Sequence, residues 1–226
     1  MQIFIDDIEV KVEKKKIKIM HLYIKPPYGE VLCTAPKFAS NKSIESFIRS
    51  NSEFIISRVN KFRNAEIPLC PQYVSGEKIA IWGDKYTLSC REGKSFNLEL
   101  LDDVAIFTDK PSSTLEQREK FFLEWYRSEL KERVDLLLPK WEEYSNLKCS
   151  SWQSKNMKTR WGTCNTKTNK IWLNVQLAKY PVECLEYVIL HELAHTKVAN
   201  HGPEFKAILN EFMPEWKTYR NRLKQL

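Results

Sequence analysis

Residues 191–201, which read HELAHTKVANH, constrain the fold of this chain more than any other segment. They contain three of its four histidines and one glutamate, Glu192. Two imidazoles four residues apart reach one cation when the backbone between them is helical, because 3.6 residues per turn bring positions i and i+4 to one face, roughly 6 Å apart. The segment therefore predicts a helix that presents His191 and His195 on one face, with Glu192 beside them.

A third imidazole follows the predicted helix. His201 lies between Asn200 and Gly202, a setting that suits a chain leaving a helix and turning back under a metal ion. Three protein ligands leave a fourth position open for water, which is typical of a catalytic rather than a structural zinc site. Glu192 can take the proton of that water, so the pattern predicts a zinc-dependent hydrolase with one Zn²⁺ ion.

The alternative is that His191 and His195 are ordinary helix residues that share this spacing by chance. The third histidine and the apolar run CLEYVIL before the first one favour the metal site. A structural Cys/His zinc site is disfavoured, because none of the six cysteines forms a C-x-x-C pair.

Further motifs surround the histidines. Upstream lies MKTRWGTCNTKTNKIWLNVQL (residues 157–177), then Pro181, YVILHELAH and finally NHGPEF, while the N-terminal half contains GEKIAIWGDKYTL (residues 76–88). This order resembles the YgjP-like metallopeptidase family and is more distantly similar to SprT-like proteases and other zincins. The resemblance implies that the whole chain is one YgjP-like unit, with zinc ligands at His191, His195 and His201 and the catalytic glutamate at Glu192. Val198 stands where the metzincins have a glycine, which argues against a metzincin turn.

The strand expected at residues 171–175 concerns the substrate. In zincins the strand before the metal helix borders the active-site cleft, so the resemblance implies that this strand could pair with an extended peptide backbone. It could equally do no more than support the metal helix. Arg160 and Asn174 are the polar residues predicted here as substrate-binding. Arg160 could polarise a carbonyl or stabilise an oxyanion, or it could hold the turn through backbone carbonyls.

Hydrophobic periodicity predicts an α+β fold. The first third alternates with period 2, as at Ile3 and Ile5, and residues 43–62 change to helical spacing, which predicts one amphipathic helix packed on a sheet. Two further β-rich stretches, residues 78–89 and 96–107, are interrupted by Gly83-Asp84 and Asp102-Asp103 and predict hairpins. A β-rich N-terminal module with one helix is therefore expected over residues 1–112.

Helices are expected to dominate residues 113–226, the zincin-like module, in which a short strand precedes the metal-binding helix. Ser113 and Glu116 form a plausible capping box for a first helix, which Pro139 is expected to end or kink. Pro181 suits the first turn of the metal helix. Two helices are expected after His201, where Glu204 and Glu215 are interpreted mainly as surface residues, although either could hydrogen-bond a ligand imidazole.

Composition suggests a cytoplasmic protein. The N-terminal residues are acidic where a signal peptide would be apolar, no stretch approaches the roughly 18 apolar residues of a membrane span, and the scattered cysteines are interpreted as reduced thiols. The net charge of +7 is spread along the chain, with a small cluster of Lys155, Lys158 and Arg160. We interpret it as basic surface without a nucleic-acid motif, although an anionic partner stays open.

Peptide-bond hydrolysis is the favoured activity, with a peptide or an unfolded protein as the substrate. A second hypothesis keeps the single metal but assigns a small anionic or nucleotide substrate, because of the positive charge at residues 155–160. Phosphoryl chemistry usually requires two metals or a carboxylate-rich cluster, which ranks it lower. A third hypothesis is a non-catalytic zinc-containing binding module. Glu192 weighs against it, because a purely structural site does not need that base.

Overall fold

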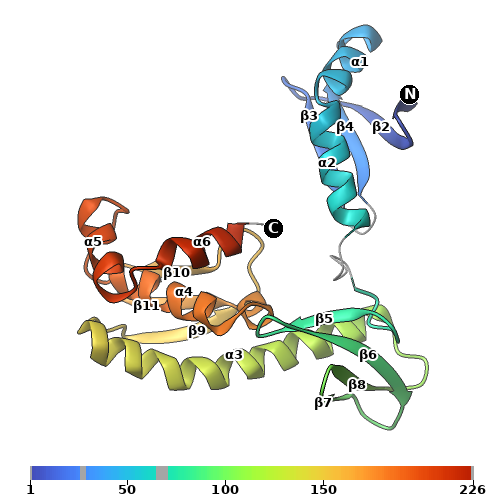
Figure 1. Cartoon of the computed structure of the whole chain (residues 1–226). Helices are drawn as coiled ribbons and strands as arrows, with labels where there is room; N and C mark the ends of the chain where they lie inside the picture. Colours follow the sequence, from blue (N-terminus) through green and yellow to red (C-terminus); the bar gives the residue numbers. More distant parts are fainter. Residues whose placement is uncertain (1, 26–28, 65–70, 225–226) are drawn as a thin grey trace. The chain divides into compact units, whose positions relative to one another are not determined.

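The chain forms two compact units, Met1–Lys78 and Ile79–Leu226. A computed structural model describes residues 2–25, 29–64 and 71–224. Strands dominate the N-terminal part and helices dominate the C-terminal part (Figure 1), which confirms the predicted α+β class. Residue 112, where the sequence suggested the end of a β-rich module, lies inside the second unit. The division into functional domains at residues 1–112 and 113–226 stays a prediction.

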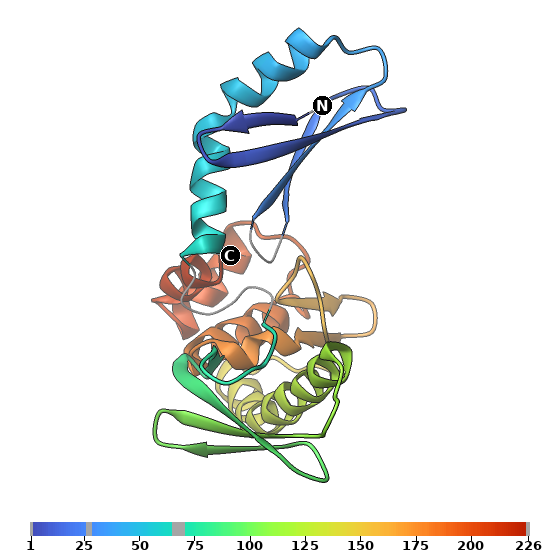
Figure 2. The same ribbon diagram turned by 90° about the vertical axis from the view of Figure 1, so that its right-hand side faces the viewer.

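The first unit is built on a four-stranded sheet, seen from two sides in Figures 1 and 2. Its strands are β1 (Gln2–Ile5), β2 (Ile8–Lys15), β3 (His21–Lys25) and β4 (Glu30–Pro36), in the order β1-β2-β4-β3. The β1/β2 and β3/β4 pairs are antiparallel, and β2 lies parallel to β4. Alternate residues such as Ile3 and Ile5 are buried while Phe4 is 58% exposed, so one face of the sheet forms the core, as the period-2 pattern predicted.

Two helices, not one, cover that face. The prediction of a single helix over residues 43–62 was wrong: α1 (Asn41–Ser50) and α2 (Ser52–Arg63) meet at Asn51. Asn51 leaves helical geometry, and its side-chain Nδ2 donates to the carbonyl of Phe47 at 2.8 Å, so the amide ends the first helix. The helices bury Ile44, Ile48, Ile55 and Val59 against the strands.

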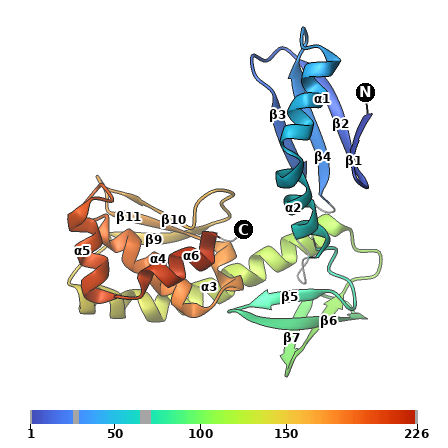
Figure 3. The same ribbon diagram turned by 45° about the horizontal axis from the view of Figure 1, so that its top comes forward.

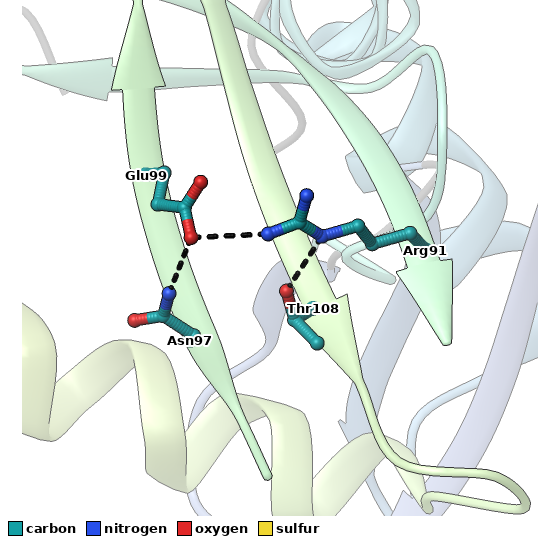
Figure 4. Close-up of polar contacts among 4 residues, drawn as sticks. All are labelled: Arg91, Asn97, Glu99 and Thr108. Carbon is teal, nitrogen blue, oxygen red and sulfur yellow. Dashed lines mark hydrogen bonds and ion pairs between the residues drawn. The ribbon is translucent and has the colours of Figure 1, made fainter. Parts of the chain in front are cut away.

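The second unit begins with another four-stranded sheet. Its strands are β5 (Lys78–Ile81), β6 (Asp84–Glu92), β7 (Asn97–Leu101) and β8 (Val104–Asp109), in the order β5-β6-β8-β7. The two predicted hairpins are confirmed, and they join through the parallel pair of β6 and β8. On the exposed face, Arg91 donates to Thr108 and to Glu99, and Asn97 donates to the same Glu99 oxygen (Figure 4), so one polar network links three strands.

The long helix α3 (Leu115–Ser145) packs against this sheet, which is why the sheet belongs to the second unit. Tyr126 Oη donates to the carbonyl of Ala80 at 2.8 Å, and Trp82 Nε1 donates to Glu129 at 3.0 Å. The centroid of the Phe107 ring, in β8, lies 4.9 Å from that of the Phe122 ring, in α3. These contacts join residues on both sides of residue 112 within the second unit.

Two details of α3 differ from the sequence prediction. Its capping box is Thr114 with Gln117, one residue later than predicted: Thr114 Oγ1 accepts from the amide of Gln117, and Gln117 Oε1 accepts from the amide of Thr114. The helix also continues past Pro139 to Ser145. The buried stripe of this helix lies before the proline, at Phe122, Tyr126, Leu130, Val134 and Leu138, and Ser145 is buried after it.

A three-stranded sheet and α4 complete the core of the second unit. The strands β9 (Ser151–Lys155), β10 (Gly162–Asn165) and β11 (Lys170–Asn174) have the order β10-β11-β9, and a 3₁₀ turn (Val175–Lys179) leads to α4 (Val182–Ala194). β11 pairs with β9 on one side and β10 on the other. The suggestion that residues 171–175 pair with substrate was therefore wrong for β11, because both of its edges are occupied. The two edge strands of this sheet are β10 and β9.

Helix α4 is buried on nearly every side. Figures 1 and 3 show it between α3 and α6 (Trp216–Lys224), and α5 (Pro203–Phe212) precedes α6. Pro181 lies at the N-cap, directly before the first helical residue, Val182, and not in the first turn as predicted. No helix in residues 2–25, 29–64 or 71–224 has both the length and the apolar content to cross a membrane. Cys33, Cys149, Cys164 and Cys184 are free thiols, as predicted for them, and Cys70 lies outside the described residues.

Candidate metal centre

Three imidazoles converge at the end of α4. His191 lies in its last turn, His195 is its C-cap residue, and His201 comes from the loop before α5. The Nε2 atom of His201 lies 3.0 Å from Nε2 of His191 and 3.2 Å from Nε2 of His195. A tetrahedral zinc site with Zn–N distances of about 2.0–2.1 Å separates its nitrogen ligands by about 3.3 Å. The donor atoms of the described residues therefore fit one tetrahedral metal ion.

The opposite ring nitrogens of two imidazoles have partners of their own. The Nδ1 atom of His195 lies 3.0 Å from the carbonyl oxygen of Val198, which can only accept, so Nδ1 carries the proton and Nε2 keeps its lone pair. His191 Nδ1 lies 3.4 Å from the hydroxyl of Tyr187, one helical turn earlier. Both contacts direct Nε2 of the ring toward the shared point.

Two of the imidazoles, His191 and His195, are held in the neutral form by their surroundings. Burial lowers the pKa of His191 to about 3, helped by the neighbouring His195 and His201 and by Arg220, and burial also lowers the pKa of His195. The ring of Phe205 packs against all three imidazoles, with centroid distances of 4.7–4.8 Å. Neutral imidazole is the form that binds a metal, so this environment prepares the site for a cation.

Glu192 lies beside the histidines with its carboxyl group out of solvent. The residue is only 4% exposed, and among the described residues no donor hydrogen-bonds its Oε2 atom. Burial raises the pKa of Glu192 to about 8, while the nearby Arg160 acts in the opposite direction. A buried carboxyl oxygen without a partner is costly unless a water or an ion completes it. The unsatisfied oxygen is thus the second observation that fits a metal and a water molecule here.

Gly162, at the start of β10, makes room for this carboxyl group. A Cβ atom built at residue 162 would lie 2.5 Å from Glu192 Oε1 and 2.8 Å from its Cγ. The backbone at this residue needs no positive φ, so space and not conformation requires the glycine. The edge strand β10 therefore packs directly on the glutamate.

The comparison with family profiles decides the identity. The profile described as the YgjP-like metallopeptidase domain matches residues 20–226. The chain belongs to the YgjP-like metallopeptidase family. It is accordingly a metal-dependent peptidase, and the converging imidazoles are where its described residues can hold the metal. A search of curated proteins found no match.

Two solved structures resemble part of this YgjP-like metallopeptidase. The metallopeptidase zymogen of Methanocaldococcus jannaschii, jannalysin, is 26% identical with a TM-score of 0.37, over 41% of this chain and 94% of its own. The metallopeptidase zymogen of Pyrococcus abyssi, abylysin, is 21% identical with the same TM-score, over 40% of this chain and 90% of its own. We assign no residue role from likenesses of this size.

The two predicted substrate residues of the YgjP-like chain are connected to each other. Asn174 is 3% exposed, and its side chain bonds the backbone of Met157 at both N–H and carbonyl, the carbonyl of Arg160 and the amide of Gln176. The side-chain amide of Asn174 makes all of these hydrogen bonds to the protein's own backbone, so Asn174 positions the segment before β10 and does not bind substrate through this group. The Arg160 side chain is exposed and lies near Glu192.

Sequence reasoning missed two residues near the imidazoles, Tyr187 and Arg220. Of the glutamates considered as partners of a ligand imidazole, Glu204 is exposed and Glu215 accepts a hydrogen bond from Tyr219. The hydroxyl of Tyr187 makes the contact to a ring nitrogen instead. The i to i+4 spacing of Tyr187 and His191 was a usable signal for it. Arg220 of α6 borders the same site, and no local pattern indicated this, because α6 reaches His191 only through packing.

Proposed function

We propose that this enzyme is a zinc peptidase, with one zinc ion held by His191, His195 and His201 and with Glu192 as the general base. The observation that carries the proposal is the convergence of three Nε2 atoms beside a buried carboxyl oxygen that lacks a partner. Three imidazoles at tetrahedral spacing favour zinc over calcium or magnesium, which prefer oxygen ligands.

The chemistry divides between the ion and the chain. A bound zinc ion supplies Lewis acidity, which lowers the pKa of a water molecule and polarises the scissile carbonyl. Glu192 takes the proton of the attacking water on its carboxyl group and later delivers it to the leaving amine nitrogen. Its burial and the close backbone at Gly162 hold the carboxyl group in one orientation during both transfers.

The edge strand β10 suggests how a peptide lies in the site. It pairs with β11 on one side only, and Gly162 at its start touches Glu192. An extended peptide that adds to the other edge would pass the carboxyl group of Glu192. We therefore propose β10, in place of residues 171–175, as the strand that aligns the substrate backbone, with the guanidinium of Arg160 near the reacting carbonyl.

The two other hypotheses have less support. The described residues contain one cluster of possible metal ligands, and it has no carboxylate in its ligand set, which disfavours two-metal phosphoryl chemistry on a nucleotide. A zinc-containing binding module without activity has no need for Glu192 to be buried with an unsatisfied oxygen.

Products from a mixture of unfolded proteins test the proposal. Wild-type protein is loaded with zinc, incubated with the mixture and analysed by mass spectrometry for new termini. We expect Glu192→Gln to keep one zinc per chain and to lose turnover, whereas His195→Ala loses both. Glu183→Gln is the matched control, because Glu183 is an exposed residue in the first turn of the same helix. Undiminished turnover in Glu192→Gln would contradict the assignment of the base.

A further inference from the structure

Two cavities adjoin the imidazoles. The first, about 240 Å³, borders His191 and His201 and is lined by the rings of Tyr187 and Trp216 and by Lys206 and Arg220. We call it the Trp216 cavity. The second, about 270 Å³, borders Glu192 and is also lined by Arg160, Arg220 and Lys224. Arg220 lines both cavities, on either side of His191.

Basic side chains outnumber acidic ones among the described residues that line these cavities. None of the ion pairs there includes Lys206, Arg220, Arg160 or Lys224. Glu192 is the one carboxylate among the residues that line either cavity. A metal cation would add to this charge. Several cations around one cavity attract an anionic group, because their positive potentials add.

Arg220 is held in place by a fixed aromatic ring. Its guanidinium carbon lies 5.7 Å from the ring centroid of Trp216, which is 5% exposed. Trp216 Nε1 donates to Asn210 at 2.8 Å, and the ring stacks on Tyr187 with an interplanar angle of 12°. A guanidinium fixed in this way offers a planar fork of donors that matches a carboxylate.

We propose that the Trp216 cavity binds a carboxylate of the peptide substrate through Arg220 and Lys206, so that cleavage occurs beside an acidic group. This inference rests on the proposed peptidase function and names its substrate class. The carboxylate comes from an aspartate or glutamate side chain or from the C-terminus of the peptide. A volume of about 240 Å³ is below the roughly 300–1,000 Å³ of small-molecule sites, which suits one residue of a polymer better than a whole nucleotide.

Matched peptides test the proposal. Each peptide contains a cleaved sequence with glutamate or glutamine at the positions flanking the cut, and with a free or an amidated C-terminus. We expect the wild type to prefer the carboxylate by about tenfold to a hundredfold in kcat/KM, as one or two charge-assisted hydrogen bonds would give. Arg220→Gln should remove the preference, measured as the ratio of kcat/KM for the two peptides of a pair, and Arg220→Lys should retain part of it.

Lys217→Gln is the control for charge. Lys217 also lies over the Trp216 ring, at 5.8 Å, but it lines neither cavity, so its replacement should leave the preference unchanged. Lys206→Gln is a second variant on the cavity itself, and a reduced preference is expected for it even if Arg220→Gln folds poorly. A preference for the free over the amidated terminus, with glutamate and glutamine equal, would assign the carboxylate to the C-terminus.

Peptide binding to zinc-loaded Glu192→Gln, measured by calorimetry, distinguishes failure of this inference from failure of the proposed function. If the wild type cleaves peptides with no preference in any pair, the carboxylate proposal is overturned and the peptidase stands. If no peptide is cleaved but Glu192→Gln binds the carboxylate peptide at least tenfold more tightly, the proposed function fails and the carboxylate site stands. If Glu192→Gln binds the two peptides of every pair equally tightly, the carboxylate site is overturned, whether or not the wild type cleaves peptides.

Discussion

Replacing Gly162 by alanine should inactivate the enzyme while leaving its metal site intact. The added Cβ would lie 2.5 Å from Oε1, 2.8 Å from Cγ and 2.9 Å from Cδ of Glu192. Since carbon atoms pack at about 3.5–4.0 Å, the carboxyl group must move by roughly 1 Å. A displacement of about 1 Å in a reacting group can cost about a hundredfold in rate, so we expect kcat to fall by about that factor.

The assay measures kcat, KM, zinc content and thermal stability for four variants: Gly162→Ala, Gly202→Ala, Glu192→Gln and the double variant. Gly162→Ala should bind one zinc per chain, because no histidine lies among the nearest atoms to the new methyl group. Gly202→Ala is the matched control, since a Cβ there meets nothing within 4 Å. The double variant Gly162→Ala with Glu192→Gln should be no slower than Glu192→Gln alone, because both changes act through one carboxyl group.

A clear result would refute this reasoning. If Gly162→Ala turned over peptide at the wild-type rate with zinc bound, the carboxyl group would not need its observed position. If Gly162→Ala slowed the Glu192→Gln variant as much as the wild type, the glycine would act on something other than Glu192.

Three further predictions concern residues around the site. Asn174→Ala removes the hydrogen bonds to the backbone of Met157 and Arg160. It should lower the free energy of unfolding, measured by urea denaturation, by about 2–4 kcal/mol. It should also lower kcat, and Asn174→Asp should restore kcat only in part. Tyr187→Phe keeps the ring but loses the 3.4 Å contact to His191 Nδ1, so zinc affinity, measured against a competing chelator, should weaken by about threefold to tenfold; unchanged affinity would exclude the hydroxyl as a support of the ligand. Burial lowers the pKa of Lys179 from 10.5 to about 8, so the folded state binds fewer protons than the unfolded state between these values and stability due to this group rises with pH across that window. Lys179→Met should therefore be more stable than the wild type by up to about 3 kcal/mol at pH 7, with the difference shrinking toward pH 10.5, and a pH-independent difference would contradict the shifted pKa.

Local patterns predicted the elements whose shape depends on neighbours along the chain. The spacing of His191 and His195 requires a helix, and α4 brings both rings to one point with His201. Period-2 alternation located the strands of the first sheet, and the Gly83 and Asp102-Asp103 interruptions located the turns of two hairpins. Each of these follows from backbone geometry over a few residues.

Predictions failed where side-chain contacts and packing decide between alternatives that the local pattern leaves open. Residues 43–62 have a continuous helical pattern, but the Asn51 side chain takes the Phe47 carbonyl and divides them into two helices. Pro139 was predicted to end or kink its helix, and it does not end it, because α3 continues to Ser145. β11 looked like a possible docking strand, because the sequence does not tell which strands are its neighbours.

The sequence by itself determined the ligand set that we propose, the base beside it and the α+β class, because these depend on residue type and on spacings set by helix and strand geometry. Only the tertiary structure decided that Gly162 touches Glu192, that Asn174 holds the segment containing Arg160, and that Arg220 of α6 stands beside His191. These contacts join residues that are 14 to 30 positions apart in the chain, where packing and not periodicity chooses the partner.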